Sequence, residues 1–282
     1  MAKQNKIFAE SLFDNMLTYQ QYLQILSEMA MSTFVWNNLP DSVDERTIEL
    51  NLLRAGMCVY FNDDVLGNLC LPVLPSSSFD VYGNPYKRTA YSNYNSYHME
   101  LSVENSVIIY NNKYRSPSYQ YLVNTAKRLY NCDRIQDVNI NAQKTPYFIL
   151  ASEAQRLTMQ NIFEKIDGNQ PVIFGDKHLE MANIKVLDLK APFVADKIND
   201  MKVRIWNEAL TVLGIPNVSI SKKERLVSDE VSRNQGGIMV NRNSRLIPRL
   251  EACKKINNMF GTRISVSFND EYNDSKEGDI IE

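Results

Sequence analysis

Residues that could carry metal or nucleophile chemistry are few in this sequence, and their spacing argues against most such chemistry. The four cysteines are widely separated, and none forms a CxxC or Cys-His pair of the kind that holds a tetrahedral metal. They are Cys58, Cys70, Cys132 and Cys253. The two histidines, His98 and His178, lie 80 positions apart, so an HExxH helix is absent. We therefore expect buried, reduced thiols in a cytosolic setting and ordinary surface or structural histidines.

Phosphate-binding and nucleophile motifs are missing as well. None of the ten glycines forms a GxxxxGK[ST], GxGxxG or GxSxG pattern. One acidic pair, Asp229 and Glu230, would suit a divalent metal in a nuclease or phosphate-transfer site. A basic cluster precedes it, Lys222, Lys223 and Arg225, which either contacts phosphates or is simply solvated. The sequence alone thus gives an enzyme hypothesis little support.

Composition indicates a folded globular protein, with 44% hydrophobic and 23% charged residues among 282. The 31 basic and 33 acidic residues give a formal net charge of -2. A sequence-reading DNA-binding domain usually carries a basic surplus, so a repressor-like module is disfavoured. The chain shows no signal peptide and no window approaching the roughly 20 apolar residues of a spanning helix, so we expect it to be soluble and unexported.

Hydrophobic periodicity predicts two helices near the N-terminus. Apolar residues between Leu12 and Ala30 recur at alternating steps of four and three, which is one face of a long helix. A capping box formed by Ser42 and Glu45 starts a second helix, and Gly56 is its natural C-cap. Both helices are predicted to be packing elements.

From residue 58 to 112 the pattern changes to short β-rich runs separated by turn residues, which predicts a small antiparallel β subdomain. The runs are residues 59–61, 69–74 and 106–110. Five tyrosines lie among Asn and Ser residues in this region, namely Tyr82, Tyr86, Tyr91, Tyr94 and Tyr97. Exposed aromatics can stack on nucleic-acid bases. Because few basic residues are interleaved here, half-buried tyrosines at a subunit contact are the better interpretation.

Two longer helices are predicted on either side of a small α/β tract. The first starts at Ser116 and Pro117, a cap residue followed by proline at the first helical position, and runs to about Asp137. The second spans residues 198–212 and ends at Gly214. Between them we expect strands at residues 147–150, 172–174 and 185–189 and a helix at residues 152–166.

The C-terminal part begins with residues 217–234, which are rich in charge and lack a sustained apolar period. We predict a mobile polar loop, extended by the two adjacent glycines that follow. A last helix is predicted over residues 249–260, capped by Gly261 and followed by a strand at residues 264–268. The tail from Asn269 carries six acidic residues against one lysine, and we expect it to be disordered.

Several long and unusual stretches of sequence identify a family. They are NAQKTP (141–146), PVIF (171–174), APFVADKIN (191–199), WNE (206–208), LGIPN (213–217), KKERLVSDEVS (222–232) and EACKKIN (251–257), with WNNLP (36–40) and VIIYNN (107–112) upstream. In order and spacing they closely resemble the portal protein of small podoviruses of the Salas type. That protein is also called the upper collar or head-tail connector. The order and spacing of these stretches agree with the family over most of residues 139–257, so the resemblance is specific.

The resemblance implies an α+β phage portal fold with long stem helices, a β-containing wing and a small α/β clip insertion. It divides the chain into N-terminal helices and wing (1–115), a stem helix (116–138), the clip (139–192), a second stem helix (193–216), a channel loop (217–237), the C-terminal helix and strand of the wing (238–268) and an acidic tail (269–282).

In this family twelve subunits form a ring at one capsid vertex, through which DNA is packaged and later ejected. The resemblance implies the same role here, without catalytic residues, metal or cofactor. The implied partners are further copies of the chain, double-stranded DNA held without sequence specificity, a packaging ATPase, the major capsid and scaffolding proteins, and a lower collar or tail protein. The protein would lie in the virion between head and tail, and in the host cytoplasm during assembly.

The resemblance also implies which residues face the DNA. Lys197 falls at a channel-lysine position of the family, and Lys222 and Lys223 match the paired lysines of its channel loop. Arg225 and Arg233 are weaker additions. Without the resemblance, Lys197 is an ordinary exposed helix residue and the loop cluster is a solvated one.

The sequence departs from the family at two places. The other channel lysine of the family aligns with Asp188, so that basic ring is lost or replaced by Lys190. The family's strongly basic N-terminal arm, which contacts a packaging RNA, is reduced here to Lys3 and Lys6, which leaves RNA binding unsupported. A capsid or tail adaptor ring without DNA in its lumen is the alternative function.

Overall fold

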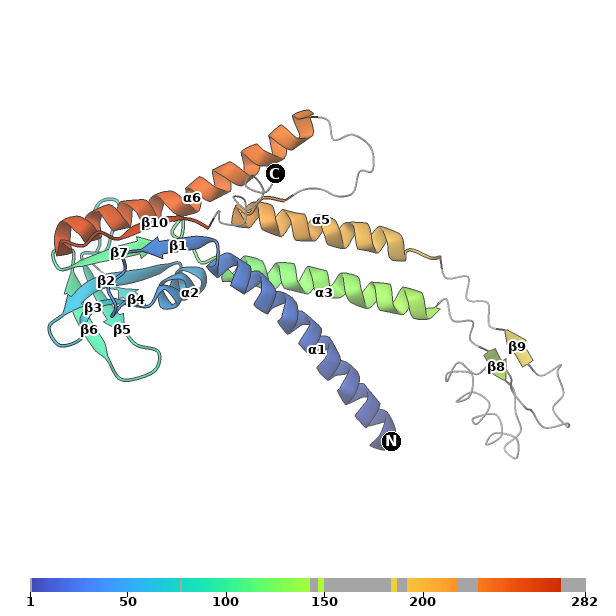
Figure 1. Cartoon of the computed structure of the whole chain (residues 1–282). Coiled ribbons are helices and arrows are strands. Elements are labelled where there is room, and N and C mark those ends of the chain that lie inside the picture. Colours follow the sequence, from blue (N-terminus) through green and yellow to red (C-terminus); the bar gives the residue numbers. More distant parts are fainter. Residues whose placement is uncertain are drawn as a thin grey trace, which may run out of the picture. The chain divides into compact units, whose positions relative to one another are not determined.

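The computed structural model describes residues 2–76, 78–142, 147–149, 184–186, 192–217 and 228–269, with the backbone alone for residues 2–15, 141–142, 147–149, 184–186 and 228–235. The chain divides into two compact units. The first unit comprises residues 1–131 and 200–282, and the second comprises residues 132–199. Helices and small sheets are mixed along the chain, which confirms the predicted α+β class (Figure 1).

Helices α1 (Ala2–Met31) and α2 (Glu45–Ala55) confirm the two helices predicted near the N-terminus. The predicted cap of α2 was wrong by two residues. Asp44 rather than Ser42 caps the helix, because the Asp44 carboxylate accepts a hydrogen bond from the backbone N–H of Thr47 at 3.0 Å. A carboxylate at this position also interacts favourably with the positive end of the helix dipole.

Gly56 ends α2 and allows a close chain crossing. Its φ of 81° lies in the left-handed region, and its N–H donates to the carbonyl of Leu52. A Cβ at this position would lie 2.7 Å from the backbone of Ser116 and Pro117. The predicted C-cap is therefore confirmed, and glycine is required for both its conformation and its size.

The strands of the first unit form three small antiparallel sheets, in the orders β3-β2-β7, β4-β5-β6 and β1-β10. The strands are β1 (Phe34–Asn37), β2 (Met57–Asp63), β3 (Gly67–Leu71), β4 (Val73–Pro75), β5 (Lys87–Tyr91), β6 (His98–Ser102), β7 (Ser106–Tyr110) and β10 (Ser265–Phe268). The predicted β subdomain is confirmed, as is the last strand. Strands β5 and β6 were missed because polar residues interrupt their short apolar pattern, and β1 was missed because its apolar run is only three residues long.

Strand β2 lies between two hydrophobic clusters. Its side chains alternate, so that Cys58 and Tyr60 join the cluster that includes residues of α2, β1 and α6, whereas Val59 and Phe61 join residues of β5 and β6. Burial on both faces explains the continuous apolar run in the sequence. All four cysteines are free and buried, as predicted. Burial raises the pKa of the Cys253 thiol to about 11.

Helix α3 (Tyr119–Ala142) starts later and ends later than its periodicity predicted. Ser118 rather than Ser116 precedes the first turn, since its carbonyl accepts the N–H of Leu122. The Ser118 hydroxyl is held by the side-chain amide of Asn111 at 2.8 Å, and the same amide donates to the carbonyl of Ser116. The proline after Ser116 therefore lies in the connection that crosses Gly56.

Helix α5 (Ala195–Leu213) confirms the second long helix and its stop. Gly214 has a φ of 76°, and its N–H donates to the carbonyl of Thr211. A Cβ at Gly214 would lie 2.8 Å from a side-chain carbon of Arg242, so the chain can pass this close to the next helix only with glycine.

Helix α6 (Ser228–Phe260) is much longer than predicted, and the prediction of a loop was wrong for residues 228–237. The two adjacent glycines and Pro248 all lie inside the helix, although each of them disfavours helical conformation. The predicted end is correct, because the N–H of Gly261 donates to Asn257. Residues 218–227 and the acidic tail from residue 270 lie outside the described residues.

The chain compensates locally for the proline within α6. Pro248 has no N–H, so it cannot donate to the carbonyl of Ser244 one turn earlier. The backbone N–H of Lys113 donates to that carbonyl instead, at 3.1 Å. The Ser244 carbonyl thus gains its hydrogen bond from a tertiary contact, which no local sequence pattern reveals.

In the second unit, β8 (Tyr147–Ile149) pairs antiparallel with β9 (Ile184–Val186). These confirm two of the predicted strands at somewhat different bounds. The strand predicted at residues 172–174 and the helix predicted at residues 152–166 lie outside the described residues.

A buried ion pair joins Glu49 of α2 to Arg249 of α6. Arg249 is 0% exposed and Glu49 is 3% exposed. Two guanidinium nitrogens donate to the two carboxylate oxygens at 3.0 and 2.8 Å, and the third donates to the carbonyl of Asn111 at 2.7 Å. The indole N–H of Trp36 donates to Glu49, and the ring of Phe34 lies 4.1 Å from the guanidinium carbon. The pair therefore connects α2, β1, the end of β7 and α6.

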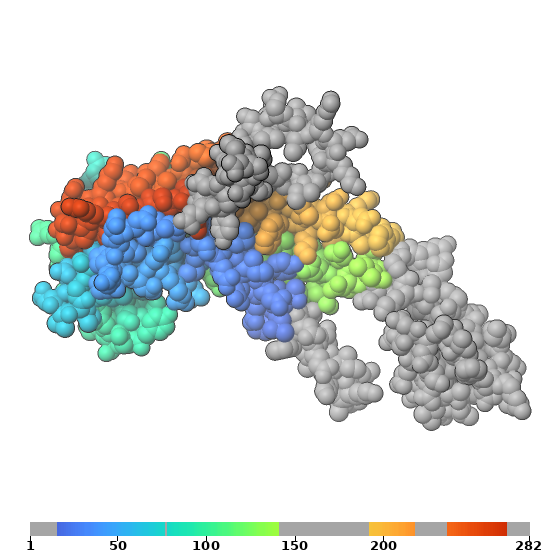
Figure 2. All heavy atoms as spheres, in the orientation of Figure 1, coloured from blue at the N-terminus to red at the C-terminus, as the bar shows by residue number. Residues whose placement is uncertain are grey.

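Arg245, about one turn earlier on α6, binds two helix ends. It donates to the carbonyl of Leu213 in α5 at 2.7 Å and to that of Ala30 in α1 at 3.2 Å. Cations are favourable at helix C-termini, where backbone carbonyls lack intrahelical partners. Burial, and then the charge of Arg249, lower the pKa of Arg245 to about 9. The ends of α1 and α5 are thus both bonded to one side chain of α6. In Figure 2 the orange-red atoms of α6 lie along the blue atoms of the N-terminal elements of the first unit.

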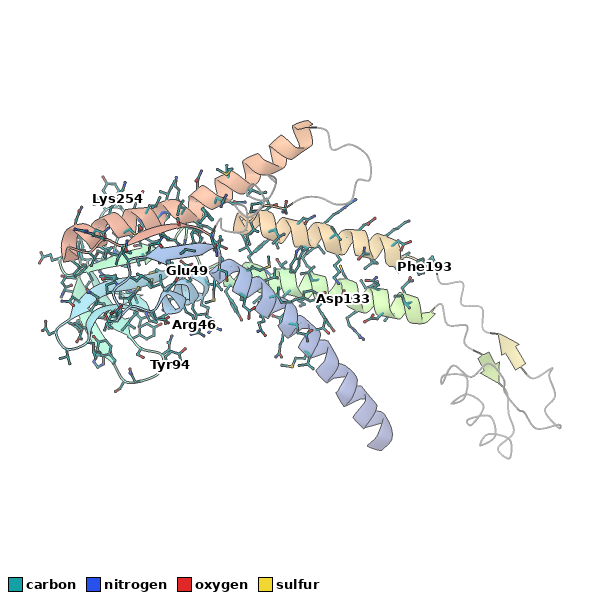
Figure 3. All side chains as sticks on the ribbon, in the orientation of Figure 1. Arg46, Glu49, Tyr94, Asp133, Phe193 and Lys254 are labelled. Atoms are coloured by element: carbon teal, nitrogen blue, oxygen red, sulfur yellow. The ribbon has the colours of Figure 1, made fainter. Side chains whose placement is uncertain are left out.

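We expect Arg249→Met to destabilise the protein by about 3–5 kcal/mol, because Glu49 would remain buried without its partner. Chemical denaturation followed by circular dichroism measures this change. Glu49→Met combined with Arg249→Met should cost clearly less than the sum of the single changes. The control is Arg46→Met, since Arg46 is exposed on the same helix as Glu49 (Figure 3). Equal losses for Arg46→Met and Arg249→Met would contradict the role given to the pair.

Candidate functional site

The basic residues predicted to face DNA lie on α5 and in the chain that follows it. Lys197 is exposed in the first turn of α5. Arg233 lies in α6, and its side chain is not among those described. The remaining three lie in residues 218–227, outside the described residues, and are Lys222, Lys223 and Arg225. The exposure of Lys197 agrees both with a channel residue and with an ordinary surface residue.

Charge is nearly balanced along the two long helices. Helix α3 carries three basic and two acidic residues, and α5 carries three of each. The basic residues are Lys127, Arg128, Arg134, Lys197, Lys202 and Arg204, and the acidic residues are Asp133, Asp137, Asp196, Asp200 and Glu208. Because acidic residues are interspersed among the basic ones, neither helix presents the continuous basic stripe that binds a DNA backbone tightly.

An ion pair joins α3 to α5 within the first unit, where the two helices run side by side (Figure 1). Arg128 donates to Glu208 at 3.1 Å, and the two side chains are 48% and 52% exposed. Exposed pairs of this kind contribute about 0–1 kcal/mol. Each helix also buries an apolar stripe, namely Leu122, Ala126 and Leu129 on α3 and Ile205, Ala209 and Leu213 on α5. Burial of these stripes contributes more than the exposed ion pair.

In the second unit, Asn139 bridges the end of α3 and the start of α5. Its amide nitrogen donates to the carbonyl of Pro192 at 2.8 Å, and its amide oxygen accepts the N–H of Val194 at 3.0 Å. One side chain therefore closes the base of the insertion that separates the two helices. The sequence analysis missed this residue, and its only signal was an asparagine between two apolar residues late in a helix.

Large apolar side chains remain exposed in the second unit. Ile135, Val138 and Ile140 of α3 are 49%, 60% and 47% exposed. Phe193, just before α5, is 57% exposed (Figure 3). Of these, Ile135 and Val138 are three positions apart and share one face of α3, and neighbouring exposed apolar residues are typical of protein-protein contacts.

The five tyrosines of the β subdomain divide into two groups. Tyr91 and Tyr97 are partly buried, and the Tyr97 hydroxyl donates to Asp63 at 2.6 Å. Burial, and then Asp63, raise the pKa of Tyr97 to about 12. The others are exposed, with fractions of 83% for Tyr82, 53% for Tyr86 and 86% for Tyr94. Within one subunit, half-burial therefore holds for the first group alone, and burial of the tyrosines at a subunit contact stays a prediction.

Within the described part of the chain, no three His, Cys, Asp or Glu side chains lie close enough to hold a metal ion. His98 is exposed, and its Nδ1 lies 3.1 Å from the carbonyl of Ser96. No helix among the described residues is both long and apolar enough to cross a membrane. Other residues that the sequence singled out have side chains outside the description, namely His178, Asp188, Lys190, Asp229 and Glu230.

Comparison with known proteins finds one matching family and several solved structures of similar fold. The family described as Phage Connector (GP10) matches residues 4–273. Among solved structures, the chain is similar to one from the portal and tail of native bacteriophage P68, with a TM-score of 0.50, 14% identity and 97% of each chain covered. A portal protein of the HK97 phage family from Corynebacterium diphtheriae gives a TM-score of 0.44 at 10% identity, covering 92% of this chain and 94% of that one. The first likeness shows a shared fold along almost the whole chain.

We expect Asn139→Ala to loosen the base of the insertion. Both hydrogen bonds of the amide are lost, and a local opening made easier by about 1 kcal/mol raises hydrogen exchange about five-fold. Hydrogen-deuterium exchange at residues 192–195 measures the effect. Asn131→Ala, at an exposed position of α3, is the matched control. Equal exchange in the two variants would show that Asn139 does not hold these segments together.

Proposed function

This chain belongs to the phage connector family, and we propose that it forms a ring of twelve subunits at one capsid vertex, through which double-stranded DNA is packaged and later ejected. As a connector it is the portal protein that joins head to tail in the virion. The family match over residues 4–273 carries the proposal, because it spans both long helices, the insertion between them and the segment after α5. The subunit number and the passage of DNA come from the resemblance to small podovirus portals.

The dimensions of the two helices favour an oligomeric channel. A helix of 19 residues, such as α5, is about 28 Å long, so one copy cannot surround a duplex. Many copies side by side can line a tunnel. The exposed apolar residues of the second unit support assembly, because their contact with a neighbouring subunit would remove them from water.

The balance of charge on α3 and α5 suits a passage. DNA carries one negative charge per about 1.7 Å of its axis, and a protein that neutralises many phosphates holds DNA tightly in a salt-dependent manner. A channel must avoid that grip. With six basic and five acidic residues on the two helices, the wall would be nearly indifferent to the duplex.

Isolated basic rings would then centre the DNA in the channel. Repeated by the symmetry of the ring, Lys197 would form one ring, and Lys222 and Lys223 would form another in the channel loop. Arg225 and Arg233 are weaker candidates for the same surface. The position of Asp188 breaks the family pattern, and Lys190 is the residue that would replace the missing ring.

The proposed partners follow from the same role. They are the packaging ATPase, the major capsid and scaffolding proteins, and a lower collar or tail protein. The stem corresponds to residues 116–138 and 193–216 and the clip to residues 139–192. The N-terminus, with Lys3 and Lys6 in place of a strongly basic arm, gives no support to a packaging RNA.

A capsid or tail adaptor ring without DNA in its lumen is the second candidate. The width of the pore distinguishes the two, since a conducting ring must admit a duplex of roughly 20 Å, a width consistent with the groove dimensions. A nuclease that uses Asp229 and Glu230 would instead show magnesium-dependent DNA cleavage by the pure protein.

Native mass spectrometry should detect closed rings of about twelve subunits, and electron microscopy should show their pore. Ile135→Asp with Val138→Asp should shift the rings to smaller species, because a charge would enter a buried contact. The control is Val65→Asp, at an 89% exposed loop position of the first unit. A wild-type protein that stays monomeric at high concentration would refute the ring, and unchanged assembly of the double variant would exclude this surface from the contact.

Changing Lys222 and Lys223 to glutamine should leave ring assembly intact but reduce the amount of packaged DNA that particles retain. Removal of two charges per subunit weakens contact with phosphates without touching the packed core. Nuclease-protected DNA in filled particles measures retention, and Lys87→Gln on the exposed side of β5 is the control. Normal retention after deletion of residues 222–225 would remove the proposed role of the loop.

A further inference from the structure

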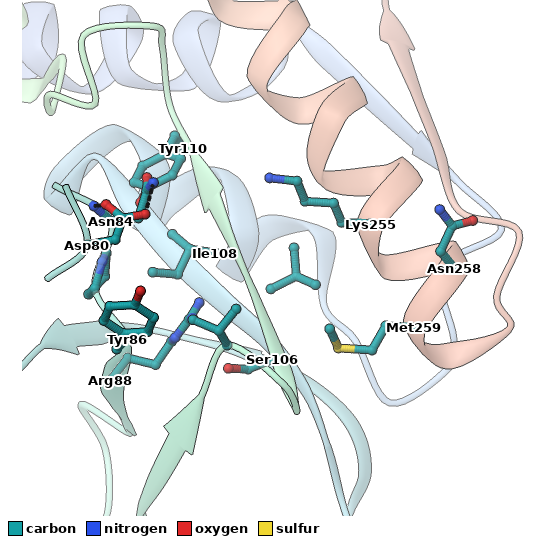
Figure 4. A pocket seen from close by; sticks show the side chains of 13 residues that line it. Asp80, Asn84, Tyr86, Arg88, Ser106, Ile108, Tyr110, Lys255, Asn258 and Met259 are labelled. Carbon is teal, nitrogen blue, oxygen red and sulfur yellow. Dashed lines mark hydrogen bonds between the residues drawn. The ribbon is translucent and has the colours of Figure 1, made fainter. Parts of the chain in front are cut away.

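A cavity of about 560 Å³ lies in the first unit, away from α3 and α5. Its walls are the segment leading into β5, strand β7 and the C-terminal part of α6. Figure 4 shows Arg88 reaching from β5 towards β7, with Lys255 and Met259 of α6 across the cavity. An adjoining cavity of about 360 Å³ shares Lys255 and is also lined by Lys113 and Arg115. The proposed DNA channel does not use this site.

Arg88 lies in the wall of the cavity, and no carboxylate among the described residues pairs with it. It is 6% exposed, because the alternation of β5 places it on the same inward face as Ala90. Its Nε has no hydrogen-bond partner among the described residues. Buried arginines are ordinarily paired with an anion, as Arg249 is with Glu49. The cavity therefore has the donor group of an ion pair without its acceptor.

The nearby carboxylate is already used by other groups. One oxygen of Asp80 accepts the backbone N–H groups of Tyr82 and Asn84 at 2.8 and 2.7 Å, and the other accepts the Asn84 side-chain amide at 2.7 Å. These bonds, that of the Asn84 side chain first, lower the pKa of Asp80. Asp80 thus shapes the loop, and Arg88 and Lys255 are the other charged residues of the lining, beside uncharged polar residues such as Tyr110 and Asn258 and apolar ones.

We propose that this cavity binds a carboxylate side chain from the chain's own acidic segment, residues 270–282. Six of these thirteen residues are acidic against one lysine, and Tyr272, Ile280 and Ile281 supply apolar groups for the rest of the wall. The charges of the two surfaces are therefore complementary. This inference is independent of the proposed DNA channel.

The segment is long enough to reach the cavity of the same molecule. It starts after Asn269, whose N–H donates to the carbonyl of Thr33 at 3.0 Å. Asn269 is only ten positions after Met259, which lines the cavity, so the two lie within about 36 Å of each other. Thirteen residues span up to about 47 Å when extended. The length of the segment thus exceeds the greatest possible separation.

Photo-crosslinking in the full-length protein tests this contact. With Tyr86→p-benzoylphenylalanine at the rim of the cavity, we expect crosslinks to residues 270–282, identified by mass spectrometry of the digested protein. Tyr94→p-benzoylphenylalanine is the matched control, because Tyr94 is 86% exposed and lines neither cavity. Crosslinks from position 86 to other segments alone would overturn the proposal.

Charge variants test the chemistry of the same contact. Lys255→Gln and Arg88→Gln should each lower the crosslink yield about ten-fold, the effect of losing one charged hydrogen bond. Lys254→Gln should leave the yield unchanged, since Lys254 lies on the side of α6 that faces away from the strands (Figure 3).

Neutralising the six acidic residues to Asn and Gln leaves the cavity itself intact and should have the same effect as Arg88→Gln. An unchanged yield in that variant would overturn the proposal even if Arg88→Gln failed to fold. Mixing isotopically labelled and unlabelled protein distinguishes contact within one molecule from contact between molecules. Crosslinks that form mainly between labelled and unlabelled copies would overturn the assignment to the same chain.

Discussion

The buried pair of Glu49 and Arg249 is the constraint on which the first unit depends. Two charges taken out of water are tolerated only when both are fully hydrogen-bonded, so each group bound to them is held in place. Asn111 and Trp36 complete the network, and they fix the end of β7 and strand β1 against α2 and α6. A pair separated by 200 residues in sequence thus decides which elements meet.

Arg245 is a second buried charge, and its hydrogen bonds fix the ends of two long helices. Among the described residues no carboxylate pairs with it, and its charge is stabilised by the terminal carbonyls of α1 and α5, where the helix dipoles are negative. The end of α5 is therefore set by a buried group on α6. Residues 215–217, the last described before α6, therefore follow a helix end that the arginine of α6 holds in place.

Local patterns predicted those features that depend on local physics. Periodicity identified α1, α2 and α5, and glycines correctly marked the ends of α2 and α5, because an apolar face and a left-handed cap depend on neighbouring residues. The start of α6 was missed because its glycines and Pro248 disfavour a helix, and a tertiary donor, Lys113, compensates for the proline. Of the candidate site, the exposure of Lys197 was predictable, whereas Asn139 acts through residues 53 and 55 positions away.

Burial also affects how the nearly balanced charge of the sequence is distributed between core and surface. Three arginines are buried among the described residues, Arg88, Arg245 and Arg249, against a single buried carboxylate, Glu49. None of these three charges is available to phosphates at the surface. Among the described residues, burial therefore removes two more positive than negative charges from the surface. In the DNA channel proposed above, exposed lysines such as Lys197 would then supply a larger share of the attraction to a duplex, because fewer of the chain's positive charges lie at the surface.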